Sequence, residues 1–313
     1  MDESEARGVW SAILAELGIG RGDVVYLGVD MGRLPLPAYA APLTREGMRQ
    51  REAVWRAFLL AVLQEALGPE GTILAPAFSY DYARRGTPFH LESSPSEVGP
   101  FTEFLRQQPE AARSLHPIFS VCGVGRQARA ILDNVGKSAF GGRSPFMRLK
   151  DHDAKFLCLG ASFAASNTYI HHVEQLYGVN HMFTKAYHAP VFRGGVEMPG
   201  PWLAFVRYLG AGIEIDFHPF EARLRSEGAL RESGRWNRPM QCVSVHEVDR
   251  VGGRMLEENP WAFVRYPVEV RMEHDPEAPA PDQAETWSGT WRAAKRSRFA
   301  RTGEPDRRNE PEG

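Results

Sequence analysis

Residues 154–178, AKFLCLGASFAASNTYIHHVEQLYG, indicate the fold class of this chain. The segment opens with a short apolar run, AKFLCLG (154–160), whose length and closing glycine are typical of a buried strand. SNTYIHHVEQLYG (166–178) follows, with helix-capping residue types at its start and Gly178 at its end. A buried strand that leads directly into a helix is the repeating unit of α/β proteins.

The same alternation continues on the N-terminal side of this segment. The patterns read, in order, as a helix over 5–18, a strand VVYLGV (24–29), a helix over 49–67, a strand within GPEGTILAPAF (68–78), a helix over 97–108 and a strand FSVCGVG (119–125). We therefore predict an α/β fold with a central, mostly parallel or mixed sheet, flanked by helices in a three-layer sandwich.

The last third of the chain has a different character. Residues 190–272 hold several β-rich runs and one helical pattern at about 219–227, which predicts a β-rich C-terminal extension. We expect one domain over 1–273, with a C-terminal lobe at about 190–273. In 274–313, Pro, Glu, Asp and Arg dominate, and such a segment cannot bury enough apolar surface to offset its ordering entropy. We expect a disordered tail there.

Composition excludes several classes of protein. The 313 residues are 43% hydrophobic and 24% charged with a net charge of −2, so a low-complexity chain, a nucleic-acid partner and a basic membrane-binding surface are not expected. Three scattered cysteines provide no disulfide framework and no CxxC zinc pair. The acidic start MDESEAR and the short apolar runs, such as 57–63, indicate neither a signal peptide nor a membrane span. We expect a cytoplasmic protein that acts on a small molecule.

Residues 166–174, SNTYIHHVE, carry the densest chemistry. They follow a predicted strand, where open α/β sheets bind their ligands, and in a helix His171 and Glu174 share one face. A carboxylate beside an imidazole fixes its tautomer and favours general-base catalysis. Asn167 or Thr168 would cap this helix, whose amide end favours a developing negative charge. An incidental surface ion pair remains an alternative, whereas zinc is disfavoured because HHxxE lacks the HExxH spacing.

Three other segments carry polar residues at loop boundaries. They are SSPSEVG (93–99), which reads as a helix-capping signal, RSLHPIFS (113–120) and the turn GGRSP (141–145). In the second of these, His116 has the alternative of packing a turn before Pro117. No GxGxxG follows the first strand and no GxxxxGK[ST] occurs, so nucleotide cofactors of the Rossmann or P-loop type lack support.

In their order and spacing, six stretches resemble the aminoglycoside 3-N-acetyltransferase family. They are GDVVYL (22–27), GPEGTILAPAFSYD (68–81), SPSEVGPFTEFLRQ (94–107), RSLHPIFSVCGVG (113–125), GRSPFMRL (142–149) and KFLCLGASFAASNTYIHHVE (155–174). The resemblance covers residues 20–180 well and the rest weakly. It implies an α/β sandwich that transfers an acetyl group from acetyl-CoA, as co-substrate and without a metal, to a small-molecule amine.

The resemblance also assigns roles to residues. The family pattern TxxHxxE falls on Thr168, His171 and Glu174, so His171 is the expected catalytic base and His172 is not. The residues that match family segments around CoA and the mouth of the site are Ser96, Glu97, Gly99, Ser114, His116, Pro117 and Ser120. For the acceptor we expect contacts from Asp30, Asn167 and Thr168. We expect a monomer or a homodimer.

The departures from the family concern the acceptor. After the first strand, where resistance enzymes show HxSL, this chain reads GVDM (28–31), and a Pro-rich insert follows at 34–42. Gly28 removes a side chain that could bind an acceptor, while Asp30 adds a carboxylate that attracts an amine. We therefore expect a compact amino sugar or similar amine rather than a standard aminoglycoside. The acidic partner that some members give their histidine has Glu214 and Asp216 as candidates.

The expected reaction is direct transfer. An amine must lose a proton before it attacks a thioester, and a histidine with a reference pKa of ~6.5 can accept that proton. A covalent route through Cys122 is the less favoured alternative, because a free cysteine in a strand is usually buried. Two other functions stay open: a hydrolase of CoA thioesters or amides in which His171 activates water, and a catalytically idle member that binds a ligand.

Overall fold

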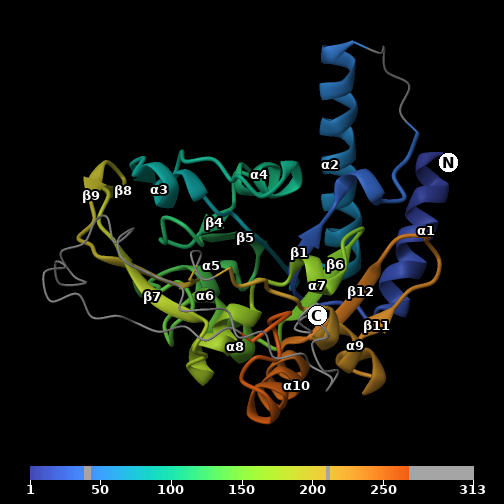
Figure 1. The fold of residues 1–313 in the computed structure, drawn as a ribbon. Helices are drawn as coiled ribbons and strands as arrows, with labels where there is room; N and C mark the ends of the chain where they lie inside the picture. Colours follow the sequence, from blue (N-terminus) through green and yellow to red (C-terminus); the bar gives the residue numbers. More distant parts are fainter. Residues whose placement is uncertain (39–43, 209–211, 268–313) are drawn as a thin grey trace, which may run out of the picture.

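A computed structural model describes residues 1–38, 44–208 and 212–267 of the chain. Its centre is a seven-stranded sheet of order β11-β12-β6-β1-β2-β5-β4 (Figure 1). The predicted disordered tail at 274–313 and residues 39–42 of the Pro-rich insert lie outside the described residues. Within the described ranges, no helix combines the length and apolarity that a membrane crossing needs.

The sheet is mixed, so of the two arrangements predicted the mostly parallel one is wrong. Parallel pairing joins β1 (Val24–Val29) to β2 (Thr72–Pro76) and to β6 (Lys155–Leu159). The outer pairings are antiparallel. On one side, β5 (Val121–Gly125) pairs with β2 and with β4 (Ala112–Arg113). On the other side, β12 (Met240–Ser244) pairs with β6 and with β11 (Arg231–Glu232). Apolar runs identify strands but carry no information on direction, because a buried strand reads the same in either direction.

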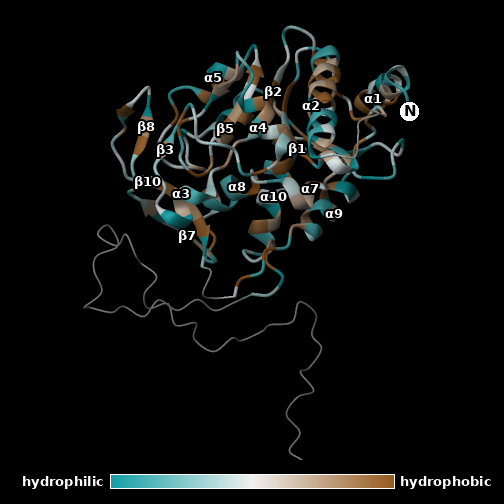
Figure 2. Ribbon diagram, turned by 90° about the horizontal axis from the view of Figure 1, so that it is seen from above, coloured by the Kyte–Doolittle hydropathy of each residue, from teal (hydrophilic) through white to brown (hydrophobic). Residues whose placement is uncertain are grey.

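Helices cover both faces of this sheet, which confirms the predicted sandwich. Alternate residues of β1 point to opposite faces: Val25 and Leu27 join one core cluster, and Tyr26 joins the other. The first face packs against α1 (Glu3–Glu16), α2 (Arg45–Leu67) and α4 (Pro100–Arg106). Figure 2 shows the two-sided character of α2, whose ribbon alternates between hydrophilic and hydrophobic colours.

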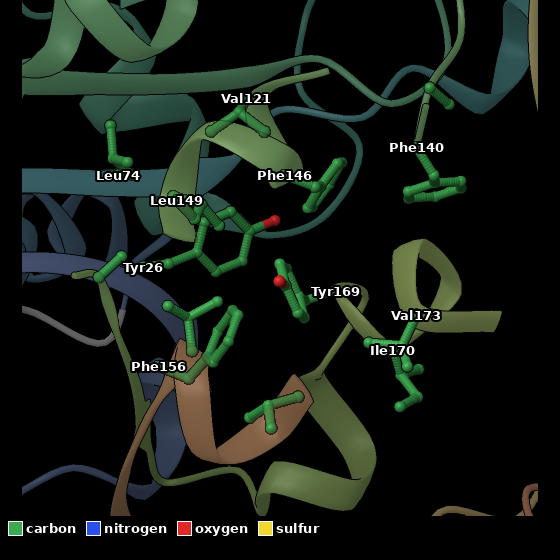
Figure 3. Close-up of a cluster of buried hydrophobic side chains, with 14 of the residues drawn as sticks. Tyr26, Leu74, Val121, Phe140, Phe146, Leu149, Phe156, Tyr169, Ile170 and Val173 are labelled. Atoms are coloured by element: carbon green, nitrogen blue, oxygen red, sulfur yellow. The ribbon is translucent and has the colours of Figure 1, made fainter. Parts of the chain in front are cut away.

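The second face holds the aromatic core behind the candidate site. Its helices are α5 (Ala128–Leu132), α6 (Pro145–Asp151), α7 (Phe163–Ser166), α8 (Ile170–Tyr177), α9 (His218–Ser226) and α10 (Val245–Glu258). Tyr26 packs against Phe146 and Phe156, with ring centroids 6.0 and 5.7 Å away (Figure 3). Phe156 in turn lies 5.1 Å from Tyr169, the residue before α8. This chain of rings ties α8 to the central strands.

The remaining elements lie outside the central sheet. They are η1 (Met31–Arg33), α3 (Tyr80–Arg85), the three-stranded sheet of β3 (Phe89–His90), β8 (Val191–Arg193) and β9 (Val196–Glu197), and the pair β7 (Met182–Tyr187) and β10 (Trp202–Arg207). In Figure 1, β8 and β9 lie at the opposite end of the molecule from α1.

Several helices differ from their predicted bounds. The helix expected over 49–67 begins at Arg45, because Thr44 caps it by accepting the Gly47 N–H. The helix expected over 97–108 begins only at Pro100, because Gly99 adopts a φ of +130° that no helix accommodates.

The C-terminal third departs furthest from the predicted lobe. Its strand β12 pairs with β6 in the central sheet, so this region completes the main core. The prediction of a single helix there is wrong, since α10 follows β12 directly and is capped by Ser244.

Candidate active site

His171 and Glu174 lie one turn apart on α8, and their side chains meet. The His171 Nδ1–H donates to Glu174 Oε2 over 2.6 Å. The imidazole is partly open to solvent, with 24% of its side chain exposed, whereas the carboxylate is fully buried. This bond fixes the tautomer and leaves Nε2 as the nitrogen with a free lone pair. In the described parts of the chain, Nε2 has no hydrogen-bond partner.

Glu174 has a second imidazole partner that sequence reasoning missed. The Nε2–H of His181, just before β7, donates to Glu174 Oε1 over 2.9 Å, and neither side chain is exposed. Burial by itself raises the pKa of Glu174, but the hydrogen bonds from His171 and His181 outweigh it and hold that pKa below its usual value. The carboxylate is therefore ionised and held from both sides.

Two aromatic rings border the His171 imidazole. Phe140, from the turn before α6, lies 5.7 Å away, and Phe217, at the start of α9, lies 5.9 Å away, measured between ring centroids. The two rings confine the imidazole and lower the polarity around its carboxylate bond. Motif reasoning did not identify either ring, because both come from segments that are distant in sequence from the TxxHxxE motif.

The neighbouring His172 has a structural role. It is buried, and its Nδ1–H donates to the Phe140 carbonyl over 2.5 Å. Burial lowers the pKa of His172, so this ring is neutral near pH 7. The choice of His171 over His172 therefore agrees with the burial of the two rings.

The residue before α8 anchors the helix to its neighbours. The Tyr169 hydroxyl donates to Asp249 Oδ1 of α10 over 2.7 Å, and Asp249 Oδ2 lies 2.8 Å from Lys150 Nζ of α6. Because three helices meet at this carboxylate, the start of α8 has little freedom to shift. These contacts therefore also fix the position of His171, two residues after Tyr169.

The predicted helix cap is wrong. The capping position of α8 is Tyr169, which makes no side-chain cap, while the Asn167 side-chain oxygen accepts the Tyr169 N–H just outside the helix.

Two distant residues hold the preceding short helix, α7. Gln241 accepts the Phe163 N–H over 2.7 Å, and Glu221 accepts the Ala164 N–H over 2.8 Å. Thr168 is half-buried, and its contact with an acceptor, like that of Asn167, remains a prediction.

The carboxylates considered as partners of His171 have other partners. Glu214 pairs with Arg265 over 3.3 Å, and Asp216 pairs with His218 over 3.0 Å. The carboxylate that holds His171 is Glu174, from its own helix. Asp216 nevertheless precedes Phe217 in the chain, so its pair with His218 lies near the rim of the site.

The exit of the first strand differs from the expectation. Asp30 caps η1 and forms an ion pair with Arg33 over 3.1 Å, so its carboxylate already has a basic partner. Gly28 does not open space for an acceptor: a Cβ there would lie 2.5 Å from Ser166 Oγ. Ser166 occupies the space that a side chain at position 28 would take, and the contact of Asp30 with an acceptor stays a prediction.

The residues predicted around CoA fall into two groups. Ser96, Glu97 and Gly99 form an accessible turn before α4. Ser96 Oγ lies 2.9 Å from Thr102 Oγ1, Glu97 is exposed and accepts the Asp81 N–H, and no heavy atom lies within 4 Å of a Cβ built on Gly99. This turn leaves room for a ligand.

Ser114, His116 and Ser120 are instead fully buried, with partners inside the protein. Ser114 Oγ accepts the Val121 N–H, and Ser120 Oγ donates to the Ala77 carbonyl. The His116 ring donates to one carbonyl and accepts two backbone N–H groups. Direct contact between these side chains and CoA is therefore not supported, and they brace the loop from within.

Comparison with known proteins identifies a family and relatives that this chain resembles. A model of the family described as aminoglycoside 3-N-acetyltransferase matches residues 49–257. Aminoglycoside N(3)-acetyltransferase III of Pseudomonas aeruginosa is 30% identical over 181 residues, covering 52% of this chain and 65% of that protein. Aminoglycoside N(3)-acetyltransferase VIII of Streptomyces fradiae is 28% identical over 201 residues, covering 58% and 65%. The chain thus matches about 65% of the length of each of these two relatives.

Solved structures share the fold. The aminoglycoside acetyltransferase AAC(3)-Xa superposes with a TM-score of 0.65 at 22% identity, covering 82% of this chain and 97% of that one. AAC-IIIb, solved as a binary complex with CoASH, gives a TM-score of 0.63 at 23% identity and covers 80% and 96%. Since the family model matches well over half of the sequence, this chain belongs to the aminoglycoside 3-N-acetyltransferase family.

Proposed function

We propose that this protein is a CoA-dependent N-acetyltransferase that acetylates a primary amine of an amino sugar or a similar small molecule. Family membership supports the reaction class. The observation that carries the proposal is the bond of His171 to a buried, ionised Glu174. It prepares one ring nitrogen to accept a proton in a partly open site.

The proposed step is direct transfer with His171 as general base. The amine nitrogen attacks the thioester carbonyl, the C–N bond forms, and His171 Nε2 takes the proton that the amine loses. The C–S bond then breaks, and the proton passes from His171 to the departing thiolate. Glu174 stabilises the imidazolium between these two events. Catalysis of this kind contributes about 10²–10⁴ in rate.

A cysteine nucleophile fits the structure poorly. Cys122 is fully buried in β5, and burial raises the pKa of its thiol to about 12. At neutral pH the thiolate that would attack a thioester is therefore scarce. The buried position agrees with the expectation from sequence and supports transfer without an acyl-enzyme.

The accessible turn at Ser96, Glu97 and Gly99 is the proposed contact for CoA, because it leaves space beside α4. On the acceptor side the names of the relatives point to aminoglycosides. At the end of the first strand, however, Asp30 pairs with Arg33, and Ser166 fills the space beside Gly28. These contacts affect which acceptors could bind there. The acceptor assay therefore includes gentamicin-like and kanamycin-like compounds and compact amino sugars.

The test is a thiol-release assay with acetyl-CoA over an amine library. We expect release that depends on the amine, and loss of most of the rate in His171→Ala with CoA affinity retained. His246→Ala is the matched control, because this histidine is exposed on α10 and pairs with Asp153. Fast release without any amine would instead favour the hydrolase, and failure to bind CoA would favour an idle member. Near wild-type turnover of His171→Ala would refute the base.

A further inference from the structure

The carboxylate of Glu174 lies in an unusual position for a charge. It is fully buried, and each of its two oxygens accepts one imidazole N–H, from His171 on one side and His181 on the other. A buried carboxylate needs such donors, because desolvation favours its neutral form. The charged or titratable groups that act on it in the described residues are these two histidines.

The surroundings of His181 define its tautomer. Its Nδ1 is buried without a hydrogen-bond partner in the described residues, and its ring lies 5.5 Å from the Trp261 ring. A proton on Nδ1 would be a buried donor with no acceptor, which is unfavourable. The proton of the neutral ring therefore sits on Nε2 and faces Glu174. His171, in contrast, has its second nitrogen on the accessible side.

We propose that His181 is a positioning residue that keeps Glu174 ionised and aimed at His171, a role that rests on the proposed function. His181 supplies a hydrogen bond without taking the proton that His171 collects from the acceptor. Without it, Glu174 would retain one donor in a buried site and would be protonated more readily. His171 would then lose both its orientation and the stabilisation of its charged form.

The test compares two substitutions. His181→Phe keeps the ring but removes the donor, whereas His181→Gln can place an amide N–H near the former Nε2. We expect the Phe variant to lose rate, by less than the factor of about 10²–10⁴ expected for His171→Ala. The acidic limb of its kcat/KM profile should move to lower pH, in the same direction as for Glu174→Gln, because a Glu174 that is protonated more readily stabilises the His171 imidazolium less. The Gln variant should recover part of both effects.

A double-mutant cycle separates this role from general packing. If His181 acts through Glu174, His181→Phe should cost little further rate in a Glu174→Gln background. An unmoved acidic limb in a folded Phe variant, equal behaviour of the Phe and Gln variants, or additive losses in the cycle would overturn the proposal.

A spectroscopic measurement does not depend on activity. Nitrogen-15 NMR of the histidine-labelled protein should show the Nε2–H tautomer for neutral His181 and the Nδ1–H tautomer for neutral His171. The His171 preference should weaken in His181→Phe. A wild-type protein that transfers no acetyl group but shows these tautomers would refute the proposed function and leave the positioning intact. The opposite tautomer at His181 would refute the positioning alone.

Discussion

The protein should become less stable as the pH falls below about 6.5, and His116 should account for a measurable part of this loss. Its buried ring is hydrogen-bonded at both nitrogens. Nδ1 accepts the N–H groups of Ile118 and Phe119 at 3.3 and 3.0 Å, and the Nε2–H donates to the Leu203 carbonyl at 3.1 Å. A proton on Nδ1 would break two of these bonds. Burial lowers the pKa of His116 to about 4.

The magnitude follows from linkage. The unfolded chain binds a proton at this histidine near pH ~6.5, while the folded protein does so near 4. Between these values the unfolded state holds more protons, so the free energy of unfolding falls as the pH falls, by up to about 1.4 kcal/mol per pH unit. Between pH 7.5 and pH 5 the contribution of His116 is about 2 kcal/mol.

Urea unfolding of the wild type and of His116→Asn at both pH values measures this term. The Asn side chain can still accept the loop N–H groups but does not titrate, and carboxylates elsewhere contribute equally to both proteins. We expect the variant to be less stable at pH 7.5, because the bond to Leu203 is lost, yet to lose about 2 kcal/mol less on going to pH 5. Equal losses in the two proteins would refute the assignment of a neutral, buried His116.

Three further predictions test the site and its support. Glu174→Gln should lower turnover less than His171→Ala and move the acidic limb of the pH–rate profile to lower pH, because the imidazolium loses its carboxylate; an unmoved limb would mean that the two side chains do not interact. Gly28→Ala should destabilise the protein by about 1–3 kcal/mol in urea unfolding, and Ser166→Gly should restore part of this, whereas no recovery would contradict the packing. Asp249→Asn should cost about 1–3 kcal/mol and reduce kcat/KM, and a loss below ~0.5 kcal/mol would show that the anchor before α8 is unimportant.

The strands of the central sheet could be predicted because their apolar runs reflect burial on both faces. The direction of β5 and β12 could not, since it depends on pairing between segments distant in sequence. Helix α10 was missed because Gly252 and Gly253 weaken a helical pattern. In the structure they serve packing: a Cβ on Gly253 would lie 2.5 Å from the Tyr177 hydroxyl.

The His171–Glu174 pair was predictable because it depends on the pitch of one helix. The contact of His181 with Glu174 was not, because it needs the chain to turn back after α8. Gly178 makes this turn with φ of +66° and ψ of +47°, a conformation that suits glycine. The available signal in the sequence was a glycine that ends the helix, followed closely by a strand. A chain that turns back at Gly178 brings His181, three positions later, near the end of the helix.

The RSLHPIFS segment shows why polar residues near a site are difficult to interpret from sequence. All five N–H donors of Arg113 face neutral oxygens inside the protein, those of Ala77, Ser79, Leu91, Ser94 and Ser120. The segment nevertheless reaches the candidate site through rings: Phe119 lies 4.9 Å from Phe140, which borders His171. We therefore propose that its polar residues affect catalysis only indirectly, by holding Phe119 and Phe140 beside His171. A substitution at His116 should accordingly alter turnover only to the extent that it moves Phe119.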